Sequence, residues 1–148
     1  MTDSDYDYRE LPLATVTFPR EWEDVTQLGA DFAAAPSSGW SVFRPSFVVT
    51  SVEAAVGIDE ASAVTMTAEQ QRIPGTNVVA CDVWPHQDVP GRRIELFYPA
   101  EDYTVLVSRW IWSTGTHLVH ATASRLPHQA ESLDPVFSYL ASSLRITT

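Results

Sequence analysis

Most of the chain consists of short segments in which apolar and polar residues alternate, separated by Pro, Gly and Ser. This period of two predicts strands, at 13–18, 40–43, 47–54, 77–84 and 92–98. The apolar runs at 40–43 and 47–54 are almost continuous, which is typical of strands buried on both faces. Residues 26–35 form either a short helix or a loop. The segment 86–91 is predicted to form the turn between the strands at 77–84 and 92–98.

The strongest local signal lies at 103–126, where two β-rich segments flank Ser113-Thr114-Gly115-Thr116. A two-residue Thr114-Gly115 turn fixes the register of the hairpin. Four pairs then lie opposite each other: Ser113 and Thr116, Trp112 and His117, Trp110 and Val119, and Arg109 and His120. Both faces of the first strand are apolar, with Val105, Val107 and Ile111 on one and Leu106, Trp110 and Trp112 on the other. Such a strand is expected at the centre of a three-layer arrangement.

Two segments carry helix signals. The first follows residue 54, with Asp59 as N-cap and Pro74-Gly75 as its end. The second is 133–146, where Asp134 can cap the helix and Pro135 suits its first position. Its apolar stripe consists of Val136, Phe137, Leu140, Ala141 and Leu144.

A chain of 148 residues has the length of one ordinary domain. Residues 1–10 carry four acidic side chains against one Arg and are expected to form a flexible, solvated acidic tail. Residues 11–148 are expected to form a single α+β domain. Its sheet is predicted to be mostly antiparallel, with about six to seven strands, flanked by a middle helix and a C-terminal helix.

Charge narrows the choice of partners. The net charge is −10, and the nine basic residues are all Arg without a basic run. Phosphate backbones and anionic membranes are bound by clustered cations, so neither nucleic acid nor a membrane surface is an expected partner. The first residues lack a secretory signal, and no apolar run is long enough to cross a membrane. A soluble, cytoplasmic protein is expected.

The sequence offers few candidates for catalysis or metal binding. On a strand, His117 and His120 point to opposite faces, which argues against a shared metal. Cys81, the single cysteine, lies in an apolar strand and is expected to be a buried structural thiol. No serine nucleophile motif or phosphate-binding glycine loop occurs. No metal and no cofactor are expected.

The predicted hairpin brings Arg109 and His120 together on an otherwise apolar face. This pair is either the floor of a cleft for an anionic group or ordinary polar residues near a sheet edge. Of the five tryptophans, three are expected in the core and one or two at a partner or ligand surface.

Three segments together resemble a known family: TFPREW at 17–22, FRPSFVVTSVEA at 43–54 and the closing hairpin with LDPVFSYLASSLRI at 133–146. They are similar to the actinobacterial LpqN/LpqT lipoproteins, whose fold is that of PsbP-like α+β domains. The resemblance implies a curved antiparallel sheet between helices, and a binding or assembly role without a shared active site. The sequence has no lipidation cysteine near its start, so membrane anchoring does not carry over.

Three functions stay open at this point. The first is a non-enzymatic protein-interaction or assembly module whose partner is another protein or a second copy of itself. The second is a carrier that holds an apolar or anionic amphiphilic ligand between sheet and helix, with Arg109, His120, Trp110 and Trp112 as ligand-binding residues. The third is an enzyme with an unrecognised pocket.

Overall fold

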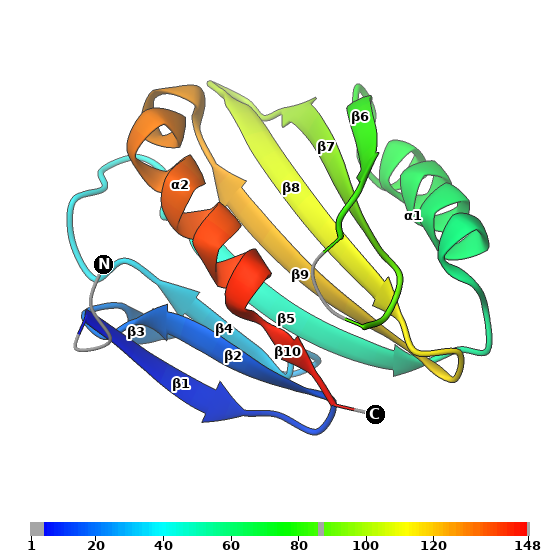
Figure 1. Cartoon of the computed structure of the whole chain (residues 1–148). Coiled ribbons are helices and arrows are strands. Elements are labelled where there is room, and N and C mark those ends of the chain that lie inside the picture. The colour runs from blue at the N-terminus through cyan, green and yellow to red at the C-terminus, as the bar shows by residue number, and fades with distance from the viewer. Residues whose placement is uncertain (1–4, 86–87, 148) are drawn as a thin grey trace.

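A seven-stranded antiparallel sheet, ordered β3-β4-β5-β9-β8-β7-β6, organises the chain (Figure 1). The computed structural model describes residues 5–85 and 88–147, so His86 and Gln87 of the expected turn lie outside the described residues. The strands of this sheet are β3 (Glu23–Asp24), β4 (Phe32–Ala35), β5 (Ser46–Glu53), β6 (Asn77–Val83), β7 (Gly91–Pro99), β8 (Thr104–Ser113) and β9 (His117–Arg125). A smaller sheet, β1-β2-β10, consists of β1 (Tyr6–Glu10), β2 (Ala14–Pro19) and β10 (Arg145–Ile146).

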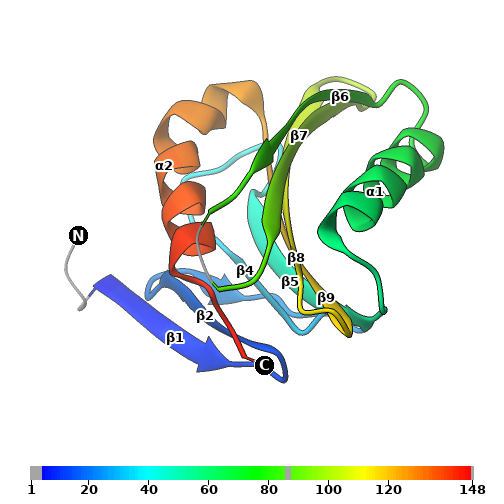
Figure 2. The ribbon, with the colours of Figure 1, turned by 45° about the vertical axis from the view of Figure 1, so that its right-hand side comes forward.

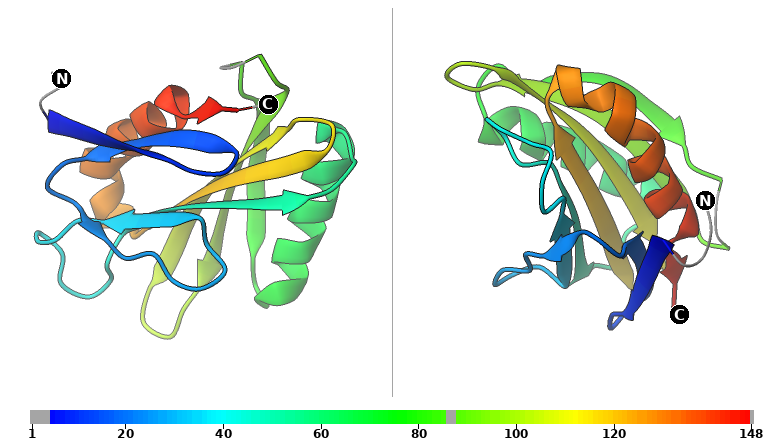
Figure 3. Two further views of the ribbon diagram at one scale, coloured as in Figure 1. Left: turned by 90° about the horizontal axis from the view of Figure 1, so that it is seen from below. Right: turned by 90° about the vertical axis from the view of Figure 1, so that its left-hand side faces the viewer.

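Two helices pack on opposite faces of the main sheet. Helix α1 (Ile58–Arg72) lies over β6, β7 and β8, whereas α2 (Pro127–Ser143) lies over β8, β9 and the smaller sheet (Figures 2 and 3). Each face therefore has its own apolar core. The α2-side core includes Trp110, Trp112 and Phe137, and the α1-side core includes Ile94 and Ile111. The predicted α+β class is confirmed, and β8 is apolar on both faces because both faces are covered.

The N-terminal residues differ from the prediction. Residues 1–10 were expected to form a solvated tail, but Tyr6–Glu10 form β1 and pair with β2 from Tyr6 opposite Pro19 to Glu10 opposite Thr15. The Tyr6 ring packs on Tyr139 of α2 at a centroid distance of 4.8 Å. An acidic composition predicts exposure, but here the backbone of β2 supplies hydrogen-bond partners that local composition does not reveal.

Two other segments differ from the expected pattern. Phe32–Ala35, expected as helix or loop, form β4, because Phe32 lies opposite Val49 and both faces of the strand are buried. Residues 40–43, expected as a strand, form a loop in which the Trp40 indole N–H donates to the Pro36 carbonyl oxygen at 3.1 Å. At Phe32–Ala35, pairing with β5 outweighs the local sequence preference. At residues 40–43, the contact with Pro36 belongs to a loop and not to a strand.

Both helices begin earlier than expected. Helix α1 has Gly57, not Asp59, as its N-cap, and Asp59 lies in the first turn. Helix α2 begins at Pro127 rather than at Asp134, so Pro135 lies inside the helix. Gln129 makes the earlier start possible, because its side chain accepts a hydrogen bond from the Leu126 N–H at 2.8 Å and donates one to the Phe43 carbonyl at 3.0 Å.

The hairpin register is shifted by two residues from the prediction. Ser113 lies opposite Leu118, Ile111 opposite His120 and Arg109 opposite Thr122. The turn is centred on Gly115-Thr116 instead of Thr114-Gly115, because Gly115 has a φ of +95° and occupies the first central position. A shift of two keeps every side chain on its predicted face.

Candidate functional site

The predicted polar pair lies beneath α1. Arg109 and His120 share the α1 face of the sheet as expected, but they are diagonal neighbours and not directly opposite. The Arg109 guanidinium pairs with Glu69 of α1 at 3.0 Å, and the Glu69 side chain is only 7% exposed. Glu69 also binds Arg72 at 2.8 Å. The helix thus fills the place where an open cleft was considered.

The environment of His120 favours its neutral form. Burial, followed by the nearby positive charge of Arg109, lowers the pKa of His120 from 6.5 to about 4. Its Nδ1 and the Arg109 Nε are buried without a hydrogen-bond partner among the described residues. The cluster of Glu69, Arg109 and His120 is therefore a buried polar contact between helix and sheet.

The predicted tryptophans lie on the other side of the sheet. Trp110 is 1% exposed and Trp112 is 0% exposed, and both belong to the α2-side core. Trp22 is also buried, whereas Trp40 is 39% exposed. The expectation of three core tryptophans agrees with this arrangement. A ligand-binding role of Arg109, His120, Trp110 and Trp112 stays a prediction.

A groove lies on the half of the α1 face that α1 leaves uncovered. It has a volume of about 630 Å³. Its floor consists of β4 and β5 residues that alternate with the core residues of the opposite face. The loop after β3 forms its wall. The lining residues are Val25, Gln27, Leu28, Gly29, Ala30, Ala33, Ala35, Arg44, Ser46, Val48 and Thr50. At one end Thr50 lies opposite His120, so the groove reaches toward the buried polar cluster.

The rim of this groove combines exposed apolar side chains with acidic ones. Leu28 is fully exposed, and the Arg44 guanidinium lies over the Trp40 ring at 5.5 Å from its centroid. Arg44 also forms an ion pair with Glu23. Hydrogen bonds from the side chain and backbone of Thr26, and then from Arg9, lower the pKa of Asp24 to about 2. Asp24 is therefore ionised at neutral pH, next to the groove wall.

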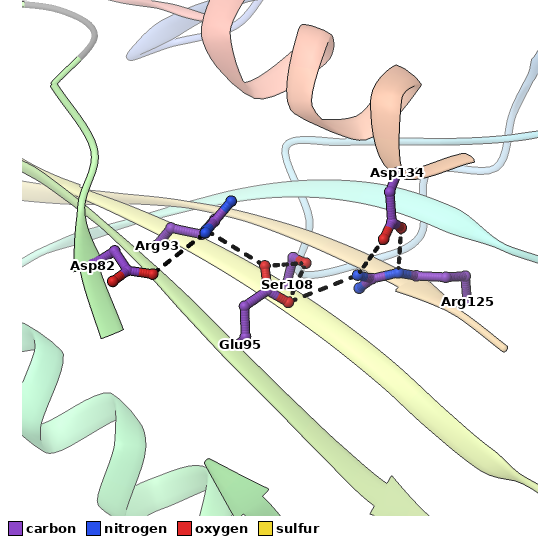
Figure 4. A network of polar contacts seen from close by, with 6 residues as sticks. All are labelled: Asp82, Arg93, Glu95, Ser108, Arg125 and Asp134. Carbon is purple, nitrogen blue, oxygen red and sulfur yellow. Dashed lines mark hydrogen bonds and ion pairs between the residues drawn. The ribbon is translucent and has the colours of Figure 1, made fainter. Parts of the chain in front are cut away.

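The α2 side carries a row of alternating charges across four strands and α2 (Figure 4). Arg93 lies between Asp82, at 3.3 Å, and Glu95, at 3.5 Å. Arg125, only 6% exposed, binds Asp134 of α2 at 2.8 Å and lies 3.7 Å from Glu95. Each cation faces two carboxylates. The row therefore links β6 to β7 and α2 to β9, and its charges are already paired with one another.

Cys81 and the two histidines of β9 do not form a reactive or metal-binding group among the described residues. Cys81 is exposed on β6, so the expectation of a buried thiol is wrong. The reason is that β6 is an edge strand, which the sequence pattern does not reveal. His117 and His120 lie on opposite faces of β9, because His120 shares the α1 face and the strand alternates. Among the described residues, no three His, Cys, Asp or Glu side chains gather as a metal site requires.

The residues of the groove were not identified from the sequence. Ala33 and Ala35 carry no chemical signature, and their place in the groove depends on β4 pairing with β5. The signal that was available is the combination of small residues with Gly29, whose φ of +96° permits the tight wall loop. Arg93, Glu95 and Arg125 were also missed, because only the strand order brings them into one row.

Comparison with known proteins places the fold. No family model and no curated protein matches the sequence. The structure is similar to LpqN, involved in cell envelope biogenesis of Mycobacterium tuberculosis, with a TM-score of 0.72 and 14% identity over 91% of this chain and 83% of LpqN. It is similar to cyanobacterial PsbP from Synechocystis, with a TM-score of 0.71 and 12% identity over 99% of this chain and 95% of that protein.

A third similar structure is a protein of unknown function from Pseudomonas aeruginosa, with a TM-score of 0.63 and 12% identity over 93% of this chain and 94% of that one. None of the helices in the described part of the chain is long and apolar enough to cross a membrane. The expected resemblance is thereby confirmed at the level of architecture: the chain has the α+β fold shared by LpqN and cyanobacterial PsbP.

Proposed function

We propose that the protein is a non-enzymatic binding module whose β4–β5 groove receives an apolar segment of a positively charged partner protein. The observation that carries this proposal is the groove itself, an uncovered half-face of the sheet with a floor of small and apolar side chains. An apolar groove of this kind, rimmed by polar residues and by the fully exposed Leu28, is typical of binding sites. A cytoplasmic location remains part of the proposal.

The shape of the groove suits a bulky apolar side chain of the partner. The small side chains of Ala33 and Ala35 leave space above the floor of the groove, and Val48 contributes apolar surface that is only partly buried. The fully exposed Leu28 on the wall gains from contact with an apolar partner, since its burial contributes roughly 2 kcal/mol.

The charge of the partner follows from the charge of this chain. The net charge is −10, and the ionised Asp24 beside the wall of the groove is itself paired with Arg9. The cation that lines the groove, Arg44, is already paired with Glu23. A basic partner is therefore steered toward the protein, whereas an acidic one is repelled.

Site-specific photo-cross-linking tests this proposal. A photoreactive phenylalanine derivative replaces Leu28 on the wall, or Val64 on the outer face of α1 as the control. We expect a partner protein to be cross-linked from position 28 and not from position 64. A synthetic copy of the cross-linked segment should then bind the purified protein saturably.

A groove-filling variant provides the second arm. Val48→Trp should weaken binding of that peptide at least tenfold, and Val52→Trp, on the same strand but outside the groove, should not. Equal cross-linking from both positions, or equal binding by both variants, would contradict the proposal.

A small-molecule carrier remains the second candidate, favoured by one observation. The groove volume of about 630 Å³ falls within the range of about 300–1,000 Å³ that is usual for small-ligand sites. Native mass spectrometry separates the two functions. A small mass that co-purifies with the wild type and is absent from Val48→Trp would support the carrier and displace the protein partner.

A further inference from the structure

The main sheet ends in two different edges. At one end, β3 has only two residues. Beyond β3, the backbone groups of Ala33 in β4 already have hydrogen-bond partners. The Val25 N–H donates to the Ala33 carbonyl oxygen and the Ala33 N–H donates to Thr26 Oγ1, both at 2.9 Å. At the other end, β6 has seven residues. Within residues 5–85 and 88–147, β6 pairs with β7 on one side and with no strand on the other. The outer side of β6 is thus the open edge of the sheet.

The hydrogen-bond phase of β6 shows which backbone groups face outward. The Trp84 N–H donates to the Gly91 carbonyl oxygen at 3.0 Å, which makes these two residues a hydrogen-bonded pair. In an antiparallel ladder such pairs alternate, so Asp82 and Ala80 also bond toward β7. Cys81 and Val83 therefore direct their N–H and C=O groups away from the sheet.

The side chains of this edge do little to prevent pairing. Natural edge strands are usually protected by charge, proline or strong bulges. In β6 the one charged side chain is Asp82, and it is bound by Arg93 at 3.3 Å. Val79 is 62% and Val83 is 64% exposed, and Cys81 is also exposed. A register shift leaves Val79 without a partner residue on β7, whereas residues 80–83 pair with β7 in regular register.

We propose that two copies of this chain pair through antiparallel β6 strands around a two-fold axis at Cys81. This register places Val79 opposite Val83 of the second copy, so that the exposed apolar side chains meet. It places Asp82 opposite Ala80 and not opposite another Asp82. The edge is therefore complementary to itself in hydrogen bonding and places no like charges directly opposite each other, which a symmetric interface requires. The inference is independent of the groove, which lies at the opposite end of the sheet.

The oligomeric state and a cysteine cross-link test the interface together. Light scattering after size exclusion should give a mass near twice the 16.4 kDa of one chain. Facing residues of a hydrogen-bonded pair have Cα atoms about 5.5 Å apart, so a short bis-maleimide should join the two Cys81 thiols in high yield. Added salt should increase the dimer fraction, since each copy carries a charge of −10.

Two variants of β6 should dissociate the dimer. Val83→Pro removes an outward N–H and no bond to β7. The double variant Val79→Lys with Val83→Lys brings like charges together across the axis and keeps every backbone donor, so it decides the question if the proline variant fails to fold. Val64→Lys, at a position that is also 62% exposed, is the matched control and should remain dimeric.

Three outcomes would overturn the proposal. They are a monomeric wild type at its highest soluble concentration, a dimer that persists in the double lysine variant, and a dimer whose Cys81 thiols are not joined by the cross-linker. The groove-filling variant Val48→Trp should leave the mass unchanged. Failure of the dimer is therefore distinguishable from failure of the groove as a binding site.

Discussion

At the scale of single residues, the buried charges beneath α1 are the most informative. Glu69 is 7% exposed and Arg109 is 22% exposed, so their ion pair lies in an environment of low dielectric constant. Charges in such a place are costly to leave unpaired. The ion pair between Glu69 and Arg109 therefore fixes the position of α1 on the sheet.

Glu69→Gln should lower the free energy of unfolding by about 3 kcal/mol, because it leaves the Arg109 guanidinium buried without a counter-charge. Urea unfolding followed by circular dichroism measures the loss. Glu60→Gln, an exposed acid on the same helix, should change stability by less than about 0.5 kcal/mol. A comparable loss of unfolding free energy in both variants would show that the buried ion pair contributes no more to stability than an exposed carboxylate does.

His120 should make stability depend on pH. Its pKa is about 4 in the folded protein and 6.5 in the unfolded reference, so the unfolded chain binds the proton more tightly. Stability is therefore complete above pH 6.5 and falls as the pH decreases toward 4, by up to about 3 kcal/mol.

Denaturant midpoints measured from pH 7 to pH 4 in the wild type and in His120→Asn check this slope. The difference between the two proteins isolates the contribution of His120 from that of the carboxylates. His128→Asn, which removes an exposed histidine, should retain the wild-type slope. If His120→Asn retains it as well, the imidazole is not held in its neutral form.

At the scale of elements, the two helices attach to the sheet in different ways. Helix α1 buries Ala61, Ser62, Thr65 and Glu69, a small and mostly polar surface. An ion pair between Arg92 and the exposed Asp59, at 2.8 Å, lies at its first turn and contributes little because water screens it. Helix α2 instead buries large apolar side chains, with Phe137 stacked on Phe47 at 6.2 Å. We infer that α2 contributes more apolar burial and α1 more specific polar contacts.

Phe137→Ala should destabilise the protein by about 3–5 kcal/mol, because it opens a cavity where a side chain that is 2% exposed packs on the sheet. The measurement is thermal or urea unfolding. Glu131→Ala, on an exposed position of the same helix, is the control and should have little effect. A loss of less than about 1 kcal/mol for Phe137→Ala would contradict the packing of α2.

At the scale of the whole molecule, the excess of negative charge works against the compact state. Most of the ion pairs have at least one exposed partner and are screened in solution. The net charge of −10 then acts mainly as repulsion across the surface. The two apolar cores oppose this repulsion, because the burial of apolar side chains favours the compact state.

Raising the salt concentration from low to physiological ionic strength should therefore raise the melting temperature, since screening weakens the repulsion. The triple variant Glu10→Gln, Glu53→Gln and Glu60→Gln changes the net charge from −10 to −7 and should gain less from salt. Differential scanning calorimetry of both proteins measures the two gains. A melting temperature that falls with salt would mean that attractive ion pairs outweigh the repulsion.

The local pattern determined the elements whose residues pack within one segment or with a close neighbour. Alternation placed β2, β5, β6, β7, β8 and β9, and the two apolar faces of β8 placed it centrally. The face shared by Arg109 and His120 also followed from the pattern, because a register shift of two residues preserves side-chain direction. The resemblance to the LpqN/LpqT family was visible in three short segments of the sequence.

Only the tertiary structure decided the features that depend on distant residues. The early start of α2 at Pro127 rests on a hydrogen bond from Gln129 to the distant Phe43, and the strands Tyr6–Glu10 and Phe32–Ala35 form only by pairing with β2 and β5. The Glu69–Arg109 pair, the groove and the open edge at Cys81 arise from strand order and from where each helix lies. Local propensity carries no information about these contacts, because they form only when the sheet is assembled.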